Sequence, residues 1–485
     1  MPTIDPTRSG VSRRVLLSAA GGVALGAGGV PMLSRAAHAA PPLGAPLFEP
    51  DIISSRKGVL EAELVAQAAT RVVGGIPRPV LTFNGTVPGP TLFVEPGDLL
   101  RIRLVNQLPE GTNIHTHGLH VSGMGNADNM MIHVMPGESF DYEIPLRSNA
   151  TEGMNWYHPH VHHHTGQQIF SGMFGTLFTQ PKGEGRIPKD ISRDRVITLS
   201  TSFWTPDGDI ASGTRTSQAR QIRLVNGEIN PTIDIAPGET QRWRFVNTSM
   251  NHVFRLTLDG HTMTRVAADG MPYTAALELT ELRLAAGQRA DVLVTGGEAG
   301  MHALRVLPFD FGFGVVSVED TLATVVCGGE GVTPTPVNLN KLLAPRTDLR
   351  KFKVDKRRTL TFTTAGGFAI DGKPFDPNRI DQVCEIGALE QWTIKNPTGL
   401  THPFHIHVNP FQVVSVNGTS VDTRSYEDTV LVDKLGGEVT FLTRFEHFLG
   451  RVIYHCHFGN HSDLGMMGQA WVVPRGCGTS PIVPV

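Results

Sequence analysis

The most chemically informative residues of this 485-residue chain lie near its C-terminal end. Cys456 stands between His455 and His457, and His461 and Met466 follow five and ten residues after the cysteine. One cysteine, one methionine and two histidines form the ligand set of a blue-copper electron-transfer centre, a trigonal site with a long axial methionine bond. Neighbouring side chains on a strand point to opposite faces, so His455 and His457 cannot share the ion of the cysteine. His455 and His457 are therefore free to bind other metal ions close to the sulfur of Cys456.

Three further histidine clusters occur earlier: His115-Thr116-His117, His158-Pro159-His160 and His402-Pro403-Phe404-His405-Ile406-His407. In a strand, residues i and i+2 share a face, so each H-x-H pair presents two imidazoles side by side. With His455 and His457, the chain holds four such pairs, which leaves His402 and His461 for the cysteine site. Imidazole suits copper, zinc, iron and nickel alike, but the cysteine–methionine spacing favours copper.

In order and spacing, these clusters resemble the four copper-binding motifs of multicopper oxidases, the family of laccases, ascorbate oxidase and bacterial cuprous oxidases. The resemblance implies four copper ions. Type 1 copper would be held by His402, Cys456, His461 and Met466, type 2 copper by His115 and His405, and the type 3 pair by His117, His158, His160, His407, His455 and His457. It also implies one-electron oxidations of a donor at type 1, coupled to reduction of O2 to water at the trinuclear cluster.

Two ligand or relay positions have competing candidates. Met467 is the alternative axial ligand, because a similar Gly-Met-Phe-Gly run around Met173 shows that part of this pattern is structural; the ten-residue spacing favours Met466. Reduction of O2 consumes protons, which carboxylates can relay. Family members carry an acid after the first pair, and Asp128 matches it best. Many bacterial members carry a glutamate where this chain has Ser462, so Asp463, or water alone, would serve as the second relay.

A ten-residue motif that occurs three times divides the chain. Gly97 to Asn106 reads GDLLRIRLVN, Gly238 to Asn247 reads GETQRWRFVN, and Gly387 to Asn396 reads GALEQWTIKN. A tight-turn dipeptide precedes each copy: Asn84-Gly85, Asn226-Gly227 and Asp371-Gly372. Alternating short strands with Gly, Pro and Asn turns predict an all-β fold. The family resemblance implies three consecutive cupredoxin-like Greek-key β-barrel or sandwich domains.

We expect domain 1 at residues 40–185, domain 2 at 186–340 and domain 3 at 341–485, and call them repeats one, two and three. Repeats one and three contain all the histidine pairs, so an eight-histidine cluster must lie at their interface. Repeat two lacks the pairs, and we expect it to bind no copper and to act as a spacer.

Residues 1–39 read as an export signal, excluded from the fold. The run from Ser12 to Leu17, SRRVLL, resembles a twin-arginine motif, and Ala37-His38-Ala39 is a plausible cleavage site. The apolar stretch between them is short and glycine-rich, so we expect no membrane anchor. The expected location is periplasmic or extracellular.

Charge and cysteine content restrict the partners. Without residues 1–39 the chain has 38 basic and 44 acidic side chains, a charge of about −6, which does not suggest nucleic acid as a partner. We expect the basic stretch at 346–358 to be a solvated strand edge. Besides Cys456, an exported protein could pair two of Cys327, Cys384 and Cys477.

The sequence therefore favours a laccase-type oxidase that uses O2 and takes electrons from a small phenolic or similar donor. A first alternative is an oxidase of Cu(I) or Mn(II), because thioethers favour Cu(I) and repeat one contains several methionines, although filling of the core is the favoured explanation for these. They are Met124, Met130, Met131, Met135 and Met154. A second alternative is a non-enzymatic copper-binding or scaffold protein, which lost ligands would mark; none is lost.

Overall fold

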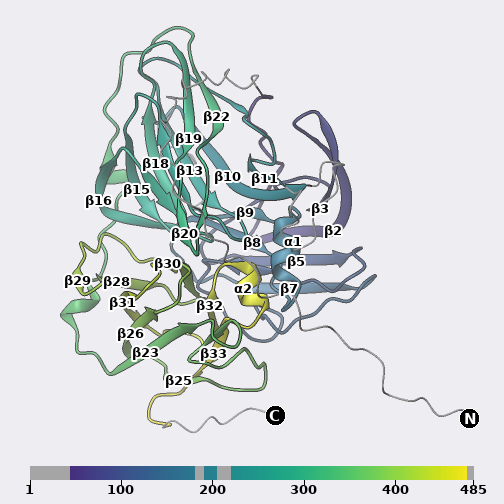
Figure 1. The fold of residues 1–485 in the computed structure, drawn as a ribbon, viewed down its shortest axis with the longest axis vertical. Coiled ribbons are helices and arrows are strands. Elements are labelled where there is room, and N and C mark those ends of the chain that lie inside the picture. The colour runs from purple at the N-terminus through teal and green to yellow at the C-terminus, as the bar shows by residue number, and fades with distance from the viewer. Residues whose placement is uncertain (1–43, 181–189, 205–219, 478–485) are drawn as a thin grey trace, which may run out of the picture. The chain divides into compact units, whose positions relative to one another are not determined.

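The computed structural model describes residues 44–180, 190–204 and 220–477, all of which belong to one compact unit (Figure 1). The predicted all-β fold is confirmed. The described helices are short: α1 (Thr165–Phe170), α2 (Gly459–Asp463) and the 3-10 turns η1 (Leu339–Lys341) and η2 (Leu349–Lys351). Among the described residues, no helix is long and apolar enough to cross a membrane. The predicted export signal lies outside the described residues.

Repeat one contains a four-stranded sheet, ordered β3-β2-β5-β7, and a five-stranded sheet, ordered β1-β4-β9-β8-β6. Its strands are β1 (Ile52–Ser54), β2 (Val59–Val73), β3 (Ile76–Phe83), β4 (Thr91–Val94), β5 (Leu99–Asn106), β6 (His115–His117), β7 (Ser139–Pro145), β8 (Gly153–His158) and β9 (Gly175–Thr179).

Repeat two contains a six-stranded sheet, ordered β11-β10-β13-β18-β15-β16, a five-stranded sheet, ordered β12-β22-β19-β14-β17, and the hairpin β20-β21. Its strands are β10 (Arg193–Trp204), β11 (Arg220–Val225), β12 (Thr232–Ile235), β13 (Thr240–Asn247), β14 (Phe254–Leu258), β15 (Met263–Ala268), β16 (Met271–Leu279), β17 (Leu282–Leu284), β18 (Arg289–Thr295), β19 (Gly300–Val306), β20 (Asp310–Gly312), β21 (Val315–Val316) and β22 (Asp320–Cys327).

Repeat three contains a six-stranded sheet, ordered β24-β23-β26-β31-β28-β29, and a five-stranded sheet, ordered β25-β33-β32-β27-β30. Its strands are β23 (Lys356–Thr363), β24 (Ala369–Ile370), β25 (Gln382–Glu385), β26 (Leu389–Asn396), β27 (His402–Ile406), β28 (Phe411–Val416), β29 (Thr419–Ser420), β30 (Thr429–Val432), β31 (Gly437–Arg444), β32 (Gly450–Cys456) and β33 (Met467–Val473).

The repeated motif has the same structural role in every copy. It forms β5, β13 and β26. Each is parallel to one neighbour in its sheet (β2, β10 or β23) and antiparallel to the other (β7, β18 or β31). The closing residues Asn106, Asn247 and Asn396 are fully buried, and each side-chain amide donates to two backbone carbonyl groups. Each side-chain oxygen also accepts the N–H two residues later. These asparagines therefore fasten the loops that follow the strands.

The preceding turn residues also match one another. Asn84, Asn226 and Asp371 have φ values of 58°, 49° and 52°, a conformation that Asn and Asp tolerate better than most residues. Each side-chain oxygen accepts a backbone N–H from the adjacent strand, β2, β10 or β23. The same local chemistry therefore builds the same turn three times. The domain boundaries chosen from the sequence remain predictions.

Core packing joins repeats one and three. A single apolar cluster contains residues of both, such as Leu104 and Phe404, whereas repeat two has a separate cluster around Trp243. Within repeat one, β6 pairs with β8 so that His115 lies opposite His158. Within repeat three, β27 pairs with β32 so that His405 lies opposite His455. Sheet pairing therefore aligns the histidine pairs within each repeat.

The structure bears on two further expectations, the pairing of cysteines and the exposure of residues 346–358. All four cysteines are free thiols, so no pair among Cys327, Cys384 and Cys477 is joined. The expectation of a solvated edge at 346–358 is wrong at Arg358, because β23 lies between β24 and β26 and this side chain, 6% exposed, pairs with buried Glu390 at 2.6 Å. It is also wrong at Leu349, which is buried, whereas residues 350–353 and 355–357 are exposed as expected.

Candidate metal centre

One group of candidate ligands joins a sulfur to two imidazoles. Cys456 Sγ lies 3.5 Å from Nδ1 of His402 and 3.6 Å from Nδ1 of His461, and the two nitrogens are 3.1 Å apart. Ligands at these separations fit around one ion with bonds of about 2.0–2.3 Å. His402 begins β27, Cys456 ends β32 and His461 lies on α2. Two paired strands and a helical turn thus hold the group, and all three side chains are buried.

Met466, the predicted axial ligand, is fully buried and attached to the same group through its backbone. Its N–H donates to the carbonyl of His461 at 2.9 Å, and its carbonyl accepts the N–H of Cys456 at 3.0 Å. The sulfur of the alternative, Met467, instead accepts the hydroxyl of Ser462 at 3.7 Å. Met466 therefore stays the predicted axial ligand.

The eight paired histidines come together between repeats one and three, and each is at most 4% exposed. His160 and His407 place Nε2 at 3.0 and 3.2 Å from Nε2 of His455, which makes one triplet from three motifs. Nε2 of His457 lies 3.2 Å from Nδ1 of His117.

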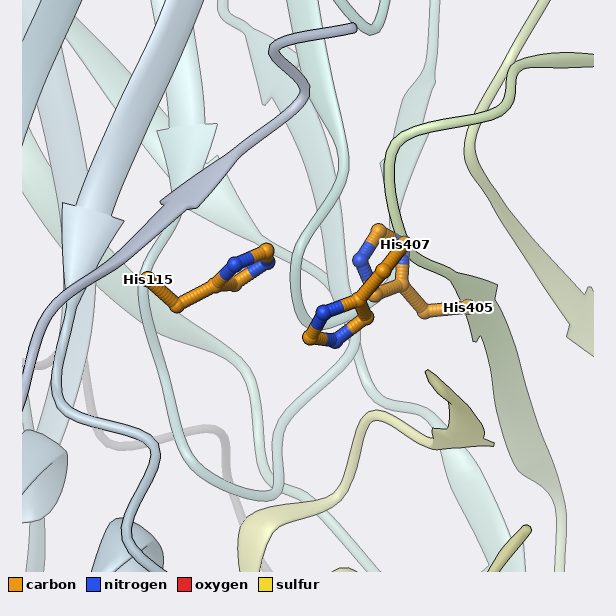
Figure 2. A group of neighbouring side chains, drawn as sticks. All are labelled: His115, His405 and His407. Atoms are coloured by element: carbon orange, nitrogen blue, oxygen red, sulfur yellow. The ribbon is translucent and has the colours of Figure 1, made fainter. Parts of the chain in front are cut away.

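The ring centroid of His158 lies 5.9 Å from that of His117 and 5.7 Å from that of His457, and the ligand atoms of His158, His117 and His115 form a second group. The ligand atoms of His115, from repeat one, also lie close to those of His405 and His407, from repeat three. The ring of His115 stacks on His407 at a centroid distance of 3.9 Å, and the imidazoles of the two repeats point toward one another (Figure 2). The groups of neighbouring ligand atoms overlap at His115, which lies both with His117 and His158 and with His405 and His407, so the division into type 3 and type 2 sets stays a prediction.

Unpartnered nitrogens show that this donor set suits metal. Within the eight-histidine cluster, the buried ring nitrogens without a hydrogen-bond partner are Nε2 of His115, His158 and His405 and Nδ1 of His160 and His457. On the first three rings, Nδ1 faces an oxygen, from Asp128, Pro159 and Asp428 respectively, at 2.8–2.9 Å. An unsatisfied buried polar group costs about 1–3 kcal/mol, and metal-binding histidines usually give their second nitrogen to an oxygen. The residues present therefore fit bound metal ions.

Burial also sets the protonation state that metal binding needs. Loss of hydration lowers the pKa of His160 and His407 well below the usual value, and neighbouring imidazoles lower it further. Burial lowers the pKa of His455 to about 4 and that of His402 to about 3. Neutral imidazole is the form that ligates a metal. Burial raises the pKa of the Cys456 thiol, so its proton leaves when a metal binds.

Comparison with protein families agrees with this donor set. Models of multicopper oxidase domains match residues 65–184, 194–325 and 344–476. The chain belongs to the multicopper oxidase family.

Three known proteins illustrate the range of its relatives. The cell division protein FtsP of Escherichia coli is 27% identical to this chain, in an alignment that covers 96% of this chain and 99% of FtsP. The multicopper oxidase of Campylobacter jejuni, described as a metallo-oxidase, is 25% identical, with a TM-score of 0.76 over 89% of this chain and 96% of its own. A laccase-like multicopper oxidase of Ochrobactrum sp., with activity towards lignin model compounds, is 25% identical, with a TM-score of 0.74 over 88% and 100%.

In this multicopper oxidase, Asp128 lies beside the predicted type 2 ligand. Its carboxylate lies 2.9 Å from Nδ1 of His115 and accepts the N–H of Thr116 at 2.9 Å. Both Asp128 and His115 are buried. The acid therefore fixes Nδ1–H as the donor and leaves Nε2 of His115 toward the cluster. Asp463 lies elsewhere: it accepts the N–H groups of His163 and Gly166, where α1 begins, and burial raises its pKa.

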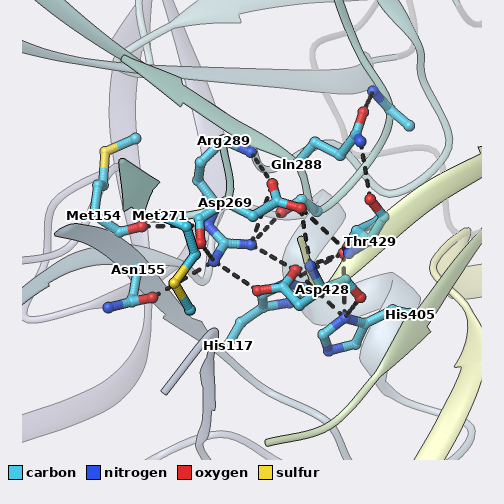
Figure 3. A network of polar contacts seen from close by, with 12 residues as sticks. His117, Met154, Asn155, Asp269, Met271, Gln288, Arg289, His405, Asp428 and Thr429 are labelled. Carbon is cyan, nitrogen blue, oxygen red and sulfur yellow. Dashed lines mark hydrogen bonds and ion pairs between the residues drawn. The ribbon is translucent and has the colours of Figure 1, made fainter. Parts of the chain in front are cut away.

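Sequence reasoning missed a polar network at the other side of the cluster (Figure 3). Asp428 lies 3.0 Å from Nε2 of His117, and its carbonyl faces His405. Fully buried Arg289, from repeat two, donates to both carboxylate oxygens of Asp428 at 2.8 and 2.7 Å and to the carbonyl of Asp269 at 3.0 Å. No short motif links these residues, so the sequence contained no local signal for them.

Repeat two therefore does more than act as a spacer. Besides supplying Arg289, its backbone closely approaches the cluster at Gly287, which has a φ of +90°. A Cβ atom there would lie 2.9 Å from the ring of His457, so only glycine fits without displacement. The spacer expectation is thus incomplete, although none of the potential metal-binding groups of the described residues includes a histidine from repeat two.

Proposed function

We propose that this protein is a laccase-type oxidase that takes single electrons from phenolic or similar donors and reduces O2 to water. The observation that carries the proposal is the continuity at Cys456. Its sulfur belongs to the three-ligand group, while its chain neighbours face other histidines of the cluster: Nε2 of His455 lies 3.0 Å from Nε2 of His160, and Nε2 of His457 lies 3.2 Å from Nδ1 of His117. A donor site and an O2 site joined through one residue suit electron transfer from one to the other.

The full complement we propose is four copper ions, in the predicted type 1, type 2 and type 3 positions. Copper, when bound, supplies the one-electron redox chemistry and the reduction of O2. The protein's part is positioning and proton supply. Asp128 orients His115 and is the nearest candidate for proton delivery, because its carboxylate touches that ring. Its role, and any role of Asp463, are part of the proposal.

The surface near the three-ligand group supports a small organic donor. His461 is the most exposed of the three ligands, at 7%. The hairpin β20–β21 of repeat two bridges to the segment before His402 through Gly312 and Leu400. Its tip residue Phe313 is 75% exposed. Exposed aromatic and apolar side chains favour contact with an aromatic ring, and an outer-sphere donor needs only such contact. We include export by the twin-arginine route in the proposal.

The test is an absorption spectrum of the copper-loaded protein, with oxygen uptake measured alongside. We expect a blue thiolate-to-copper band and phenol-dependent uptake, both abolished in Cys456→Ser, and about four copper ions per chain by elemental analysis. A Cys384→Ser variant, which removes another buried thiol, should retain both. A Cys456→Ser protein that keeps its colour and turnover would refute the assignment.

A metal-ion oxidase is the second candidate function. It is favoured by the metallo-oxidase among the similar structures and by two exposed thioethers, since Met131 and Met135 are 42% and 49% exposed. Steady-state rates with Cu(I) and with a substituted phenol separate the two functions. A large preference for Cu(I), lost in a Met131→Leu/Met135→Leu variant, would establish the second candidate.

A scaffold role is the third, because FtsP is named for cell division. The complete donor set in this chain argues for catalysis instead. Copper-loaded protein that consumes no O2 with either donor would favour the scaffold.

A further inference from the structure

A cavity of about 290 Å³ lies apart from the candidate copper ligands, and none of those ligands lines it. Three arginines from different parts of the chain line it. Arg147 follows β7 in repeat one, Arg346 lies between η1 and η2, and Arg444 ends β31 in repeat three. Glu446 is the carboxylate of the lining, and it is exposed and 4.0 Å from Arg444. An exposed pair at this distance contributes little.

The guanidinium groups are incompletely satisfied. The Nε atoms of Arg346 and Arg444 are buried and have no hydrogen-bond partner. Arg147 places Nη1 2.6 Å from Nδ1 of His447, and burial together with Arg147 lowers the pKa of that histidine, so the ring is neutral at pH 7. Burial also lowers the pKa of Arg346. Apart from exposed Glu446, the described residues of the lining offer no carboxylate to compensate these partly buried cations.

A bound anion would supply that charge. Guanidinium groups bind carboxylate and phosphate oxygens in bidentate geometry, with charge-assisted hydrogen bonds about twice as strong as neutral ones. We propose that this cavity binds a small oxyanion, a phosphate or an organic acid with two carboxylates, through Arg147, Arg346 and Arg444. The apolar wall at Ala150, Leu349 and Pro410 also accommodates a short carbon chain between two acid groups.

The cavity is connected to the histidine cluster. His120 lines it and donates Nδ1–H to the carbonyl of Val408, the residue after the cluster histidine His407. Nε2 of His120 lies 3.0 Å from Nδ1 of His447. An anion held by Arg147 and Arg444 would therefore tie repeat one to repeat three beside the interface that contains the cluster. Binding would stabilise the docked arrangement of these repeats.

Isothermal titration of the copper-loaded protein tests the site, with inorganic phosphate and succinate titrated separately at constant ionic strength set by sodium chloride. We expect saturable binding of one anion per chain, at least tenfold weaker in Arg346→Gln and in Arg147→Gln. The matched control is Arg350→Gln, because Arg350 is exposed and paired with Asp348 at 2.9 Å, and this variant should bind like the parent.

The two titrations identify the chemical class of the ligand. Saturation by phosphate alone indicates a phosphate site, saturation by succinate alone indicates a dicarboxylate site, and saturation by both indicates a site for either anion. The blue copper band should not change on titration, which shows that the anion does not bind the metal. If Arg346→Gln fails to fold, Arg147→Gln decides, because Arg147 lies in a surface loop. No saturable heat with either anion, or equal affinities in the Arg147, Arg346 and Arg350 variants, would overturn the proposal.

Discussion

The buried guanidinium of Arg289 allows a quantitative test of how repeat two supports the cluster. Its side chain is 0% exposed, and it donates two charge-assisted hydrogen bonds to Asp428 and one hydrogen bond to the carbonyl of Asp269. In Arg289→Met, two buried carboxylates lose their counter-charge: that of Asp428, and that of Asp269, which lies 3.6 Å from Nη1 of Arg289. Hydrogen bonds to charged groups contribute about 1.5–3 kcal/mol each, and breaking a buried ion pair costs about 3–5 kcal/mol. We therefore expect unfolding to become easier by about 3–5 kcal/mol.

Urea unfolding of the metal-free protein, followed by tryptophan fluorescence, measures this loss without a contribution from copper. The control is Arg305→Met, also in repeat two, because Arg305 pairs with Asp259 at 2.8 Å with both side chains about 40% exposed. An exposed pair contributes at most about 1 kcal/mol.

A double variant separates lost attraction from unpaired charge. Arg289→Met/Asp428→Asn removes one of the two uncompensated carboxylates, so it should recover part of the stability lost in Arg289→Met. An Arg289→Met protein no less stable than Arg305→Met would refute the reasoning, since it would mean that the buried network is not needed.

Three further changes have defined outcomes. Asp128→Asn should lower kcat for oxygen uptake about 10- to 100-fold, because a carboxylate that hydrogen-bonds a metal-binding histidine fixes the orientation of its ring. An unchanged kcat at full copper content would exclude this role. Burial raises the pKa of Glu427 to about 8, and Asp269 adds to the shift. The folded protein thus holds a proton on Glu427 that the unfolded chain loses near pH 4.5, so this contribution to stability is lost as pH rises from about 4.5 through 8. Glu427→Gln should therefore make the melting temperature less dependent on pH over this range. Copper removal should lower the melting temperature, since each site filled at 100 times its Kd adds about 2.7 kcal/mol; calorimetry of metal-free and loaded protein showing equal values would contradict this.

The fold and most of the candidate site were predictable because their determinants are local. H-x-H pairs reveal a shared strand face within three residues, and the recurring asparagines reveal the repeat because each performs the same hydrogen bonding. The assignment of the eight histidines to type 2 and type 3 sets stays a prediction from the family resemblance.

The residues that sequence reasoning missed depend on long-range contacts. Arg289 and Asp428 are 139 positions apart, and neither has a distinctive neighbour in the sequence. Arg346 was expected in solvent because basic residues surround it. Instead, the N–H of buried Leu349 donates to Gln412 and anchors this segment, which brings Arg346 against the cavity. Only the packed fold shows which of several arginines becomes enclosed.

The cluster is assembled from two parts of the chain that are made at different times. Repeat one supplies four of the eight imidazoles, and 242 positions separate His160 from His402, where the next cluster begins. At about 5–20 residues per second, synthesis of the intervening chain takes on the order of 10–50 s. During this interval the nascent protein displays half of a metal-binding surface with no opposing half. Ions captured then would have the wrong coordination, so we expect correct loading only after the ribosome has released the chain.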